Sequence, residues 1–336
     1  MLPVRSIMTN IVVTFQADSE QRKILTKTLD HSERVVFLSD LSAEDRVKEL
    51  SNADVLFSWS PAREIRVEEF SNIGKAKMLQ LLSAGADHVP FSKLPSSLAV
   101  ACNAGAYAEP MGEHILAMIL ALDKNLLDRH HKLKEGIFDQ SNVNRRLQGS
   151  NCAILGFGGV GKAAARILRC FGVRIYAINT TGKTSEPVEF IGTTRDLDHV
   201  LQLADIIVIT LPLTNATRGL IDSRELALIK DNAILINVAR GQIVNEHALY
   251  QKLKTCPNFM AAIDAWWNEP DQPNMSHAEF RTNYPFLDLP NVLGSPHNSG
   301  VVPGTLSEGT RHAAENIKRF TTNERILGLV NPSDYQ

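Results

Sequence analysis

Short apolar runs rich in β-branched residues alternate along this chain with longer stretches that mix polar and apolar positions. Each run has the length of a buried strand, and each mixed stretch has the composition of a helix with one apolar face. This alternation predicts parallel sheets with helices on both faces. The predicted strands of the N-terminal part are residues 11–15, 35–37, 55–57, 78–82 and 99–102, and two of its predicted helices are residues 19–29 and 42–50.

The same alternation continues through the rest of the chain. A long helix is predicted over residues 111–128, where Glu113, His114 and Asp123 interrupt an apolar stretch. A helix this apolar belongs in a deep core or at an interface, so we expect it at a domain boundary and at a dimer contact. The predicted strands here are residues 152–155, 173–178, 206–211, 233–238, 260–264 and 292–294, and further predicted helices are residues 162–169, 196–203, 245–253 and 305–320.

The order of these elements predicts an α/β protein with two doubly wound parallel-sheet domains. The helix at 305–320 follows the second set of strands and would return the chain to the first domain. We therefore expect a flavodoxin-like substrate domain split between residues 1–103 and 300–336, into which a Rossmann-type dinucleotide-binding domain, residues 104–299, is inserted. Ligands of such folds bind beyond the carboxyl ends of the strands, so the cleft between the domains is the predicted site.

A glycine-rich turn joins the strand at 152–155 to the helix at 162–169. The pattern G-x-G-x-x-G follows the strand at once, and this strand–turn–helix context indicates a dinucleotide-binding domain. The first glycine permits the tight turn, the second leaves room for a pyrophosphate, and the third lets helix and strand pack closely. The helix N-terminus then offers free N–H groups to the phosphates. The predicted phosphate-binding residues are Gly156, Gly158, Gly159, Val160 and Gly161.

Composition narrows the class of protein further. The chain has 336 residues, 44% of them hydrophobic, and a net charge of -2, which is enough for two domains and gives no reason to expect nucleic acid or an anionic membrane surface as a partner. No apolar run is long enough to span a membrane, and the N-terminal residues lack a signal-peptide core. The four cysteines are scattered, which favours free thiols in a cytoplasmic protein. We see no spacing typical of metal ligands.

Three residues that could do chemistry follow the last three predicted strands. Arg240 comes shortly after the strand at 233–238. Glu269 follows the strand at 260–264, and His297 follows the strand at 292–294. Taken alone, an arginine after a strand is most often part of a surface ion pair. A glutamate before a proline is most often solvated, and a histidine in such a loop is most often incidental. Together, on one edge of a sheet that carries a dinucleotide fingerprint, they favour hydride-transfer chemistry.

These motifs, in this order, resemble the D-isomer-specific 2-hydroxyacid dehydrogenase family. The resemblance covers nearly the whole chain and is weaker in the N-terminal part, where residues 82–87 resemble the family's substrate-carboxylate loop and residues 103–107 with 112–113 resemble the start of the interdomain helix. The motifs that carry it are the glycine fingerprint at 156–161 and residues 211–213, 237–244, 262–264, 269–270 and 290–297.

The resemblance implies a role for each candidate residue. Arg240 would bind the carboxylate and carbonyl oxygen of the substrate, His297 would be the general acid–base, and Glu269 would hold the imidazole ring and favour its protonated form. Main-chain N–H groups around Ala84 and Gly85 would take the substrate carboxylate. Asp264 would contact the nicotinamide carboxamide, and the other residues implied on the cofactor side are Leu211, Pro212, Val238 and Ala239.

The choice between NAD(H) and NADP(H) depends on the end of the strand at 173–178. An acidic residue there binds the ribose 2′-OH in NAD-preferring enzymes, and this chain has none. Asn and Thr can donate to a 2′-phosphate and a lysine can supply charge, which favours NADP(H); a polar loop that tolerates NAD(H) stays open. The residues concerned are Asn179, Thr180, Thr181 and Lys183.

Two functions remain in competition. The first is a homodimeric reductase of small 2-keto acids, such as glyoxylate or hydroxypyruvate, using NAD(P)H; Glu269, in place of the glutamine of related formate dehydrogenases, argues against formate. The second is a dinucleotide-sensing protein without turnover, as in the corepressors of this superfamily. Retention of Arg240, Glu269 and His297 favours the first.

Overall fold

The computed structural model describes residues 8–29, 33–141, 143–270 and 279–336. The chain divides into two compact units, each with its own sheet. Unit 1 comprises Met1–Tyr107 and Val302–Gln336, and unit 2 comprises Ala108–Val301.

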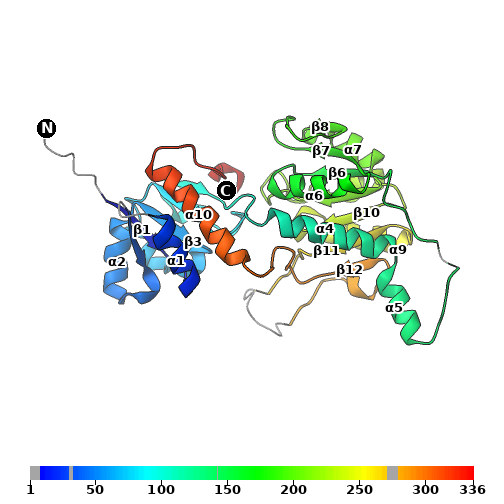
Figure 1. Cartoon of the computed structure of the whole chain (residues 1–336), viewed down its shortest axis with the longest axis horizontal. Coiled ribbons are helices and arrows are strands. Elements are labelled where there is room, and N and C mark those ends of the chain that lie inside the picture. Colours follow the sequence, from blue (N-terminus) through cyan, green and yellow to red (C-terminus); the bar gives the residue numbers. More distant parts are fainter. Residues whose placement is uncertain (1–7, 30–32, 142, 271–278) are drawn as a thin grey trace. The chain divides into compact units, whose positions relative to one another are not determined.

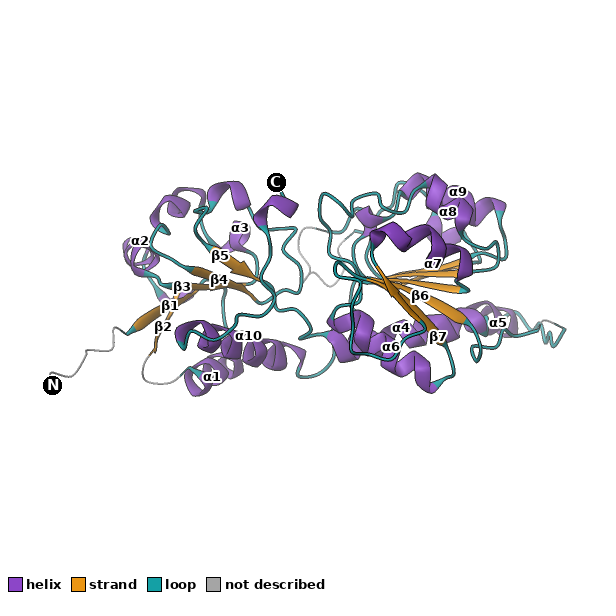
Figure 2. Ribbon diagram, turned by 90° about the horizontal axis from the view of Figure 1, so that it is seen from above, coloured by secondary structure: helices purple, strands orange, loops and turns teal. Residues whose placement is uncertain are grey.

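Unit 1 is a parallel sheet in the order β2-β1-β3-β4-β5, which is the flavodoxin-like arrangement. Its central strands carry apolar side chains on both faces, which are buried because helices cover each face (Figure 2). One face is covered by α1 and α10, and the other by α2 and α3. The elements are β1 (Thr9–Val13), α1 (Ser19–Thr28), β2 (Glu33–Phe37), α2 (Ala43–Asn52), β3 (Val55–Ser58), α3 (Pro61–Glu64), β4 (Met78–Leu81), β5 (Ala99–Ala101) and α10 (Thr305–Thr321).

The C-terminal segment of unit 1 closes one edge of this sheet. Ala101 of β5 forms an antiparallel bridge with Leu329, and Cys102 donates its N–H to the carbonyl of Gly328 at 2.8 Å. Gly328 has a φ of +67°, and a Cβ there would lie 2.2 Å from the Cys102 oxygen, so only glycine fits. The outer strand β5 is therefore paired on both sides.

Unit 2 is a seven-stranded parallel sheet in the order β12-β11-β10-β9-β6-β7-β8, the Rossmann arrangement with one further strand. Helices α4 and α6 pack on one face of the sheet, and α7, α8 and α9 on the other (Figures 1 and 2). The elements are α4 (Ala108–Asp123), α5 (Leu126–Lys134), β6 (Asn151–Leu155), α6 (Gly159–Cys170), β7 (Arg174–Ile178), β8 (Phe190–Gly192), α7 (Leu197–Leu203), β9 (Ile206–Ile209), α8 (Ser223–Leu228), β10 (Ile234–Asn237), α9 (Glu246–Thr255), β11 (Met260–Ile263) and β12 (Val292–Gly294).

The predicted class, two doubly wound parallel-sheet domains, is confirmed by the two strand orders. The single helix predicted over 111–128 is wrong: α4 ends at Asp123, and Asn125 adopts the left-handed conformation with φ 47° before α5 begins. Asparagine tolerates this conformation better than most residues, so the helix can break at Asn125. The apolar pattern nevertheless continues past the break. The short elements β8 and α8 were not predicted.

Helix α5 extends away from the sheet of its unit (Figure 1), and none of its residues is buried. It nevertheless carries large apolar side chains, and the segment after it continues the pattern up to Phe138, which is 76% exposed. In the described part of the chain, no helix is long and apolar enough to cross a membrane. The exposed apolar residues of this arm are Leu126, Leu127, Leu133, Ile137 and Phe138.

Candidate active site

The glycine-rich turn leaves the carboxyl end of β6, the strand next to the middle of the unit 2 sheet. Gly156 has a φ of +99°, and a Cβ there would lie 2.8 Å from the carbonyl oxygen of Thr210. The Oγ1 of Thr210 donates to the carbonyl of Gly156 at 2.5 Å. At Gly161 a Cβ would lie 2.3 Å from the oxygen of Gly156. Both glycines are therefore required by the packing of the turn against its neighbours.

Gly158 differs from these two, because a Cβ there would have no heavy atom within 4 Å. It is the N-cap of α6, has extended backbone and is exposed, like Gly159 beside it; Val160 is half-buried. The position of a side chain at Gly158, at the N-terminus of a 12-residue helix, is thus open. Open space, a helix N-terminus and no side chain at Gly158 fit a dinucleotide pyrophosphate.

The loop after β7 is organised by the side chain of Asn179. Its Oδ1 accepts the N–H groups of Thr181 at 3.0 Å and Gly182 at 2.7 Å, and its Nδ2 donates to the carbonyl of Lys183 at 2.9 Å. Both ends of the amide are thus engaged within the loop. Thr180, Thr181 and Lys183 are exposed around it. Asn179 therefore shapes the loop, and its three neighbours are the groups that could meet a ligand.

The remaining residues predicted on the cofactor side lie beyond β9 and β10. Leu211 is half-buried and Pro212 exposed, and the carbonyl of Pro212 accepts the Oγ1 of Thr217 at 2.6 Å. Val238 and Ala239 are buried. Pro212 is accordingly the most accessible of the four.

Arg240 follows β10 in a turn that Asn237 holds. The Nδ2 of Asn237, which is buried, donates to the carbonyl of Arg240 at 2.9 Å, and its Oδ1 accepts the N–H of Ala239 at 3.1 Å. A Cβ at Gly241 would lie 2.4 Å from the carbonyl carbon of Trp266. The turn after Arg240 therefore lies directly against the main chain that follows β11.

Glu269 and His297 form a pair at the carboxyl ends of β11 and β12. The Nδ1 of His297 lies 2.7 Å from Oε2 of Glu269, with about a third of each side chain exposed, 36% and 34% respectively. The Oε1 of Glu269 accepts the N–H of Trp266 at 2.8 Å, which fixes the carboxylate. Because Nδ1 faces Glu269, the ring nitrogen left to exchange a proton with another molecule is Nε2.

His297 has left-handed backbone, with a φ of 51°, and Asp264 stabilises the loop that holds it. The carbonyl of Asp264 accepts the N–H of His297 at 2.9 Å. The carboxylate of Asp264 accepts hydrogen bonds from the N–H groups of Asn298 and Ser299, both at 3.1 Å, and from the Oγ of Ser295. The Asp264 side chain is 0% exposed.

Burial by itself would raise the pKa of Asp264. The hydrogen bonds from Ser295, Ser299 and Asn298 outweigh burial and lower the pKa below the usual range for aspartate. Asp264 is therefore an ionised, buried anchor of the His297 loop, and its predicted contact with a nicotinamide carboxamide stays a prediction.

The sequence did not indicate that His114 joins this network. The Nε2 of His114, on α4, lies 3.2 Å from Oγ of Ser295 and 3.9 Å from Oδ1 of Asp264. The sequence placed this histidine on a helix that we expected at a domain boundary and at a dimer contact. Since 181 residues separate His114 from Ser295, no local pattern could have shown this contact.

In unit 1, the loop that carries Ala84 and Gly85 follows β4. Ala84 is exposed, and the carbonyl of Leu82 just before it accepts Tyr107 Oη at 2.6 Å and Asn103 Nδ2 at 3.2 Å. Burial raises the pKa of Tyr107 to about 12, against the opposing effect of Asn103, so the phenol stays a neutral donor. The main chain just before this loop is thus held by two side chains of the segment that follows β5.

Comparisons with known proteins agree with this arrangement. Residues 116–299, more than half of the chain, match the family model described as D-isomer specific 2-hydroxyacid dehydrogenase, NAD binding domain. The chain is 29% identical over 297 residues to a glyoxylate reductase of Aeropyrum pernix, covering 86% of each. It is 27% identical over 328 residues to a D-3-phosphoglycerate dehydrogenase of Methanocaldococcus jannaschii, covering 96% of this chain but spanning 60% of that protein. A crystal structure of a candidate formate dehydrogenase from Pyrobaculum aerophilum matches with a TM-score of 0.82 and 26% identity, covering 98% of this chain and 100% of that one.

Proposed function

The chain belongs to the family of D-isomer specific 2-hydroxyacid dehydrogenases, and from this premise we propose that it reduces small 2-keto acids to D-2-hydroxy acids with a nicotinamide dinucleotide. The observation that carries the proposal is the 2.7 Å contact between His297 and Glu269, on the same sheet that bears the glycine-rich turn. A dinucleotide turn alone fits a sensor equally well. A histidine paired with a carboxylate at the carboxyl ends of strands in the same sheet supports turnover.

In the proposed mechanism a reduced nicotinamide dinucleotide, held by the glycine-rich turn at 156–161, would supply the hydride for reduction of the substrate carbonyl. Arg240 binds the substrate carboxylate and carbonyl oxygen, a task that suits its planar, permanently charged fork. His297 donates the proton on Nε2 to the carbonyl oxygen, which becomes the hydroxyl of the product. Glu269 keeps Nδ1 of the ring engaged and thereby orients Nε2 for the transfer. In the reverse direction His297 removes the hydroxyl proton.

For the substrate we propose a small 2-keto acid such as glyoxylate or hydroxypyruvate. A glutamate at 269 supports a keto acid over formate, because proton transfer to a carbonyl oxygen needs a charged imidazole and formate oxidation has no such step. The likeness to a glyoxylate reductase supports the same choice, and the likeness to a candidate formate dehydrogenase makes formate a necessary part of the test.

The test is NADPH and NADH oxidation, followed as loss of absorbance, with glyoxylate, hydroxypyruvate, pyruvate and 3-phosphohydroxypyruvate. Formate with NADP⁺ or NAD⁺ is assayed in the oxidative direction. Turnover of a keto acid with wild-type protein, lost in His297→Ala, is the expected result. Tight dinucleotide binding without turnover of any of these compounds would favour the dinucleotide-sensing alternative, and turnover of formate alone would overturn the substrate assignment.

For the cofactor we propose NADP(H). The support is the absence of a carboxylate at Asn179 and the exposure of Thr180, Thr181 and Lys183 around it, where hydroxyls and an ammonium can meet a 2′-phosphate. Asn179→Asp keeps the acceptor for Thr181 and Gly182 and adds a charge that repels a 2′-phosphate. We expect this variant to shift the ratio of kcat/KM from NADPH towards NADH; an unchanged ratio would contradict the assignment.

We also propose that the protein is a homodimer, associated through α5 and the segment after it. The support is the set of exposed apolar residues on α5 and the segment after it, because a contiguous exposed apolar patch marks a site of protein–protein contact. Light scattering after size-exclusion chromatography should give twice the mass of the chain for wild type and the mass of one chain for Phe138→Asp. Phe171→Asp, at another exposed phenylalanine of unit 2, is the matched control and should remain a dimer.

A further inference from the structure

Two tryptophans follow β11 directly, between the turn that carries Arg240 and the loop that carries His297. Strand β11 pairs with β10 on one side and with β12 on the other. Trp266 and Trp267 therefore leave the sheet with one candidate catalytic element on each side. Trp266 is 4% exposed and Trp267 is half-buried.

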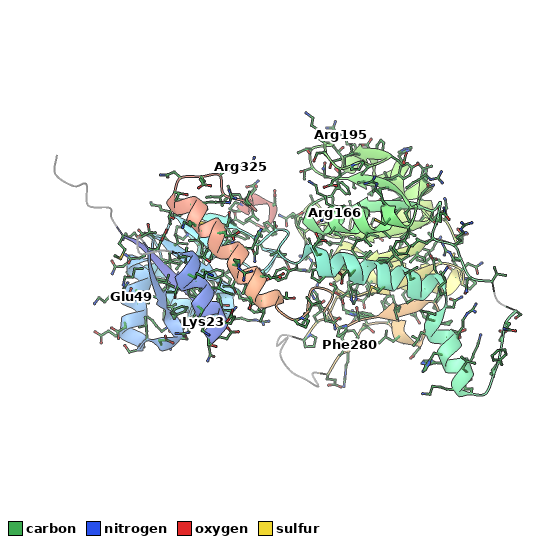
Figure 3. All side chains as sticks on the ribbon, in the orientation of Figure 1. Lys23, Glu49, Arg166, Arg195, Phe280 and Arg325 are labelled. Atoms are coloured by element: carbon green, nitrogen blue, oxygen red, sulfur yellow. The ribbon has the colours of Figure 1, made fainter. Side chains whose placement is uncertain are left out.

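Trp266 contacts the His297 side. Its Nε1 donates to the carbonyl of Ser295 at 2.8 Å, two residues before His297. Its six-membered ring lies over Gly294, where a Cβ would come within 2.9 Å of Cζ2. The ring also meets Phe280 edge-on, with centroids 4.9 Å apart (Phe280 is labelled in Figure 3). The indole thus fixes the main chain at the end of β12.

Trp267 contacts the Arg240 side. Its Nε1 donates to the carbonyl of Val244 at 2.7 Å, and its own carbonyl accepts the Nε2 of Gln242 at 3.0 Å. Val244 and Gln242 belong to the short turn that follows Arg240. The ring stacks on Phe286, with centroids 5.2 Å apart and 14° between the planes.

We propose that Trp266 and Trp267 are positioning residues that fix the spacing between the Arg240 turn and the His297 loop, with each indole N–H holding one of them. This rests on the proposed function of those two residues. Each indole ring has one N–H donor, and the two ring donors go to carbonyls on opposite sides of β11. A buried indole N–H usually finds some partner, so the alternative is that these bonds only satisfy the rings and could be lost without consequence for the reaction.

The test compares Trp266→Phe with Trp267→Phe, since each keeps an aromatic ring and removes one donor. Trp266→Phe should lower kcat for keto acid reduction about tenfold, the scale of one lost hydrogen bond, and leave KM for the keto acid unchanged, because the acid–base group moves. Trp267→Phe should raise that KM about tenfold, because the group that binds the carboxylate moves, and should lower kcat less than Trp266→Phe does.

Tyr284→Phe is the matched control. Tyr284 belongs to the same aromatic cluster and its hydroxyl lies 2.9 Å from Nδ1 of His247, so the variant loses one aromatic hydrogen bond away from Arg240 and His297. Its kcat and KM should equal those of wild type. Equal proportional changes of kcat and KM in both tryptophan variants, or no change in either, would overturn the proposal.

A second measurement does not depend on turnover. The ring ¹⁵N signals of His297, assigned by their absence from His297→Ala, should move in Trp266→Phe and stay in place in Trp267→Phe and Tyr284→Phe. If wild type turns over no keto acid while these signals separate in this way, the proposed function fails and the positioning of the loop holds. His297 signals that do not respond to Trp266→Phe would overturn the positioning role itself.

Discussion

Alanine at Gly158 and alanine at Gly161 should have opposite consequences, although both glycines belong to one motif. Gly158→Ala places a methyl group in open space, since no heavy atom lies within 4 Å of it. Its backbone, with φ -86° and ψ -154°, suits alanine. Gly161→Ala places a methyl group 2.3 Å from the oxygen of Gly156 and 3.1 Å from Cγ2 of Ile154. Backbone atoms cannot yield as a flexible side chain does.

The magnitudes follow from these contacts. At Gly158 the cost in the free energy of unfolding should be at most about 1 kcal/mol, the difference between glycine and alanine as an N-cap. At Gly161 overpacking costs about 1–3 kcal/mol or more, and the better helix propensity of alanine returns only about 1 kcal/mol. Gly161→Ala should therefore be the less stable protein, while the methyl group of Gly158→Ala occupies the space proposed for the pyrophosphate.

Urea denaturation and titration calorimetry with NADPH measure the two effects separately. We expect Gly158→Ala to unfold at nearly the wild-type urea concentration and to bind NADPH at least about tenfold more weakly, which corresponds to 1.4 kcal/mol. Gly161→Ala should unfold at a clearly lower urea concentration. Wild-type NADPH affinity in Gly158→Ala would refute the assignment of this turn to the dinucleotide, and wild-type stability in Gly161→Ala would refute the close-packing argument.

Three further variants test the acid–base pair and its support. His297→Ala should lower kcat by at least about 100-fold with NADPH affinity retained in calorimetry; an unchanged kcat would remove His297 from the mechanism. Glu269→Gln should lower kcat for keto acid reduction, because a neutral amide replaces the carboxylate that lies 2.7 Å from Nδ1 of His297; a kcat equal to that of wild type would contradict the pairing. The pKa of Asp264 is lower in the folded protein than in the unfolded chain, where an aspartate has a pKa of about 4. Its carboxylate therefore contributes stability above about pH 4, and this contribution disappears as the pH falls through the folded-state pKa. Asp264→Asn should therefore lose less of its free energy of unfolding on acidification than wild type, and equal losses in urea melts would count against the anchor.

The sequence predicted most of this fold because buried parallel strands are short apolar runs, and the runs lie where β1, β6 and β9 form. It did not predict β8, an edge strand of three residues that is too short for any period to be visible. Helix α8 was missed although Asp222 and Glu225 form a capping box at its start, a signal that was present in the sequence. The break at Asn125 could not be predicted, because the apolar pattern continues across it.

The position of the candidate site could be predicted from strand order. The strands β10, β11 and β12 are neighbours, so the residues that follow them come to one edge of the sheet. What the sequence could not supply is the set of hydrogen bonds that fixes those residues. The carboxylate of Asp264 holds the His297 loop from inside, and His114 reaches Ser295 from a distant helix. The first contact depends on the path of the loop after β12, and the second on the packing of α4 against the sheet.

The pairing of Leu329 with Ala101 at the edge of unit 1 also protects the protein from aggregation through an open strand edge. An open strand edge offers unpaired N–H and C=O groups to any other chain that can extend along it. The segment around Gly328 occupies these groups on β5 and turns away immediately afterwards. A chain shortened before Gly328 would keep its two sheets and every candidate site residue, yet it would expose a fresh template for β-aggregation. The last few residues therefore protect solubility at a place far along the sequence from the chemistry.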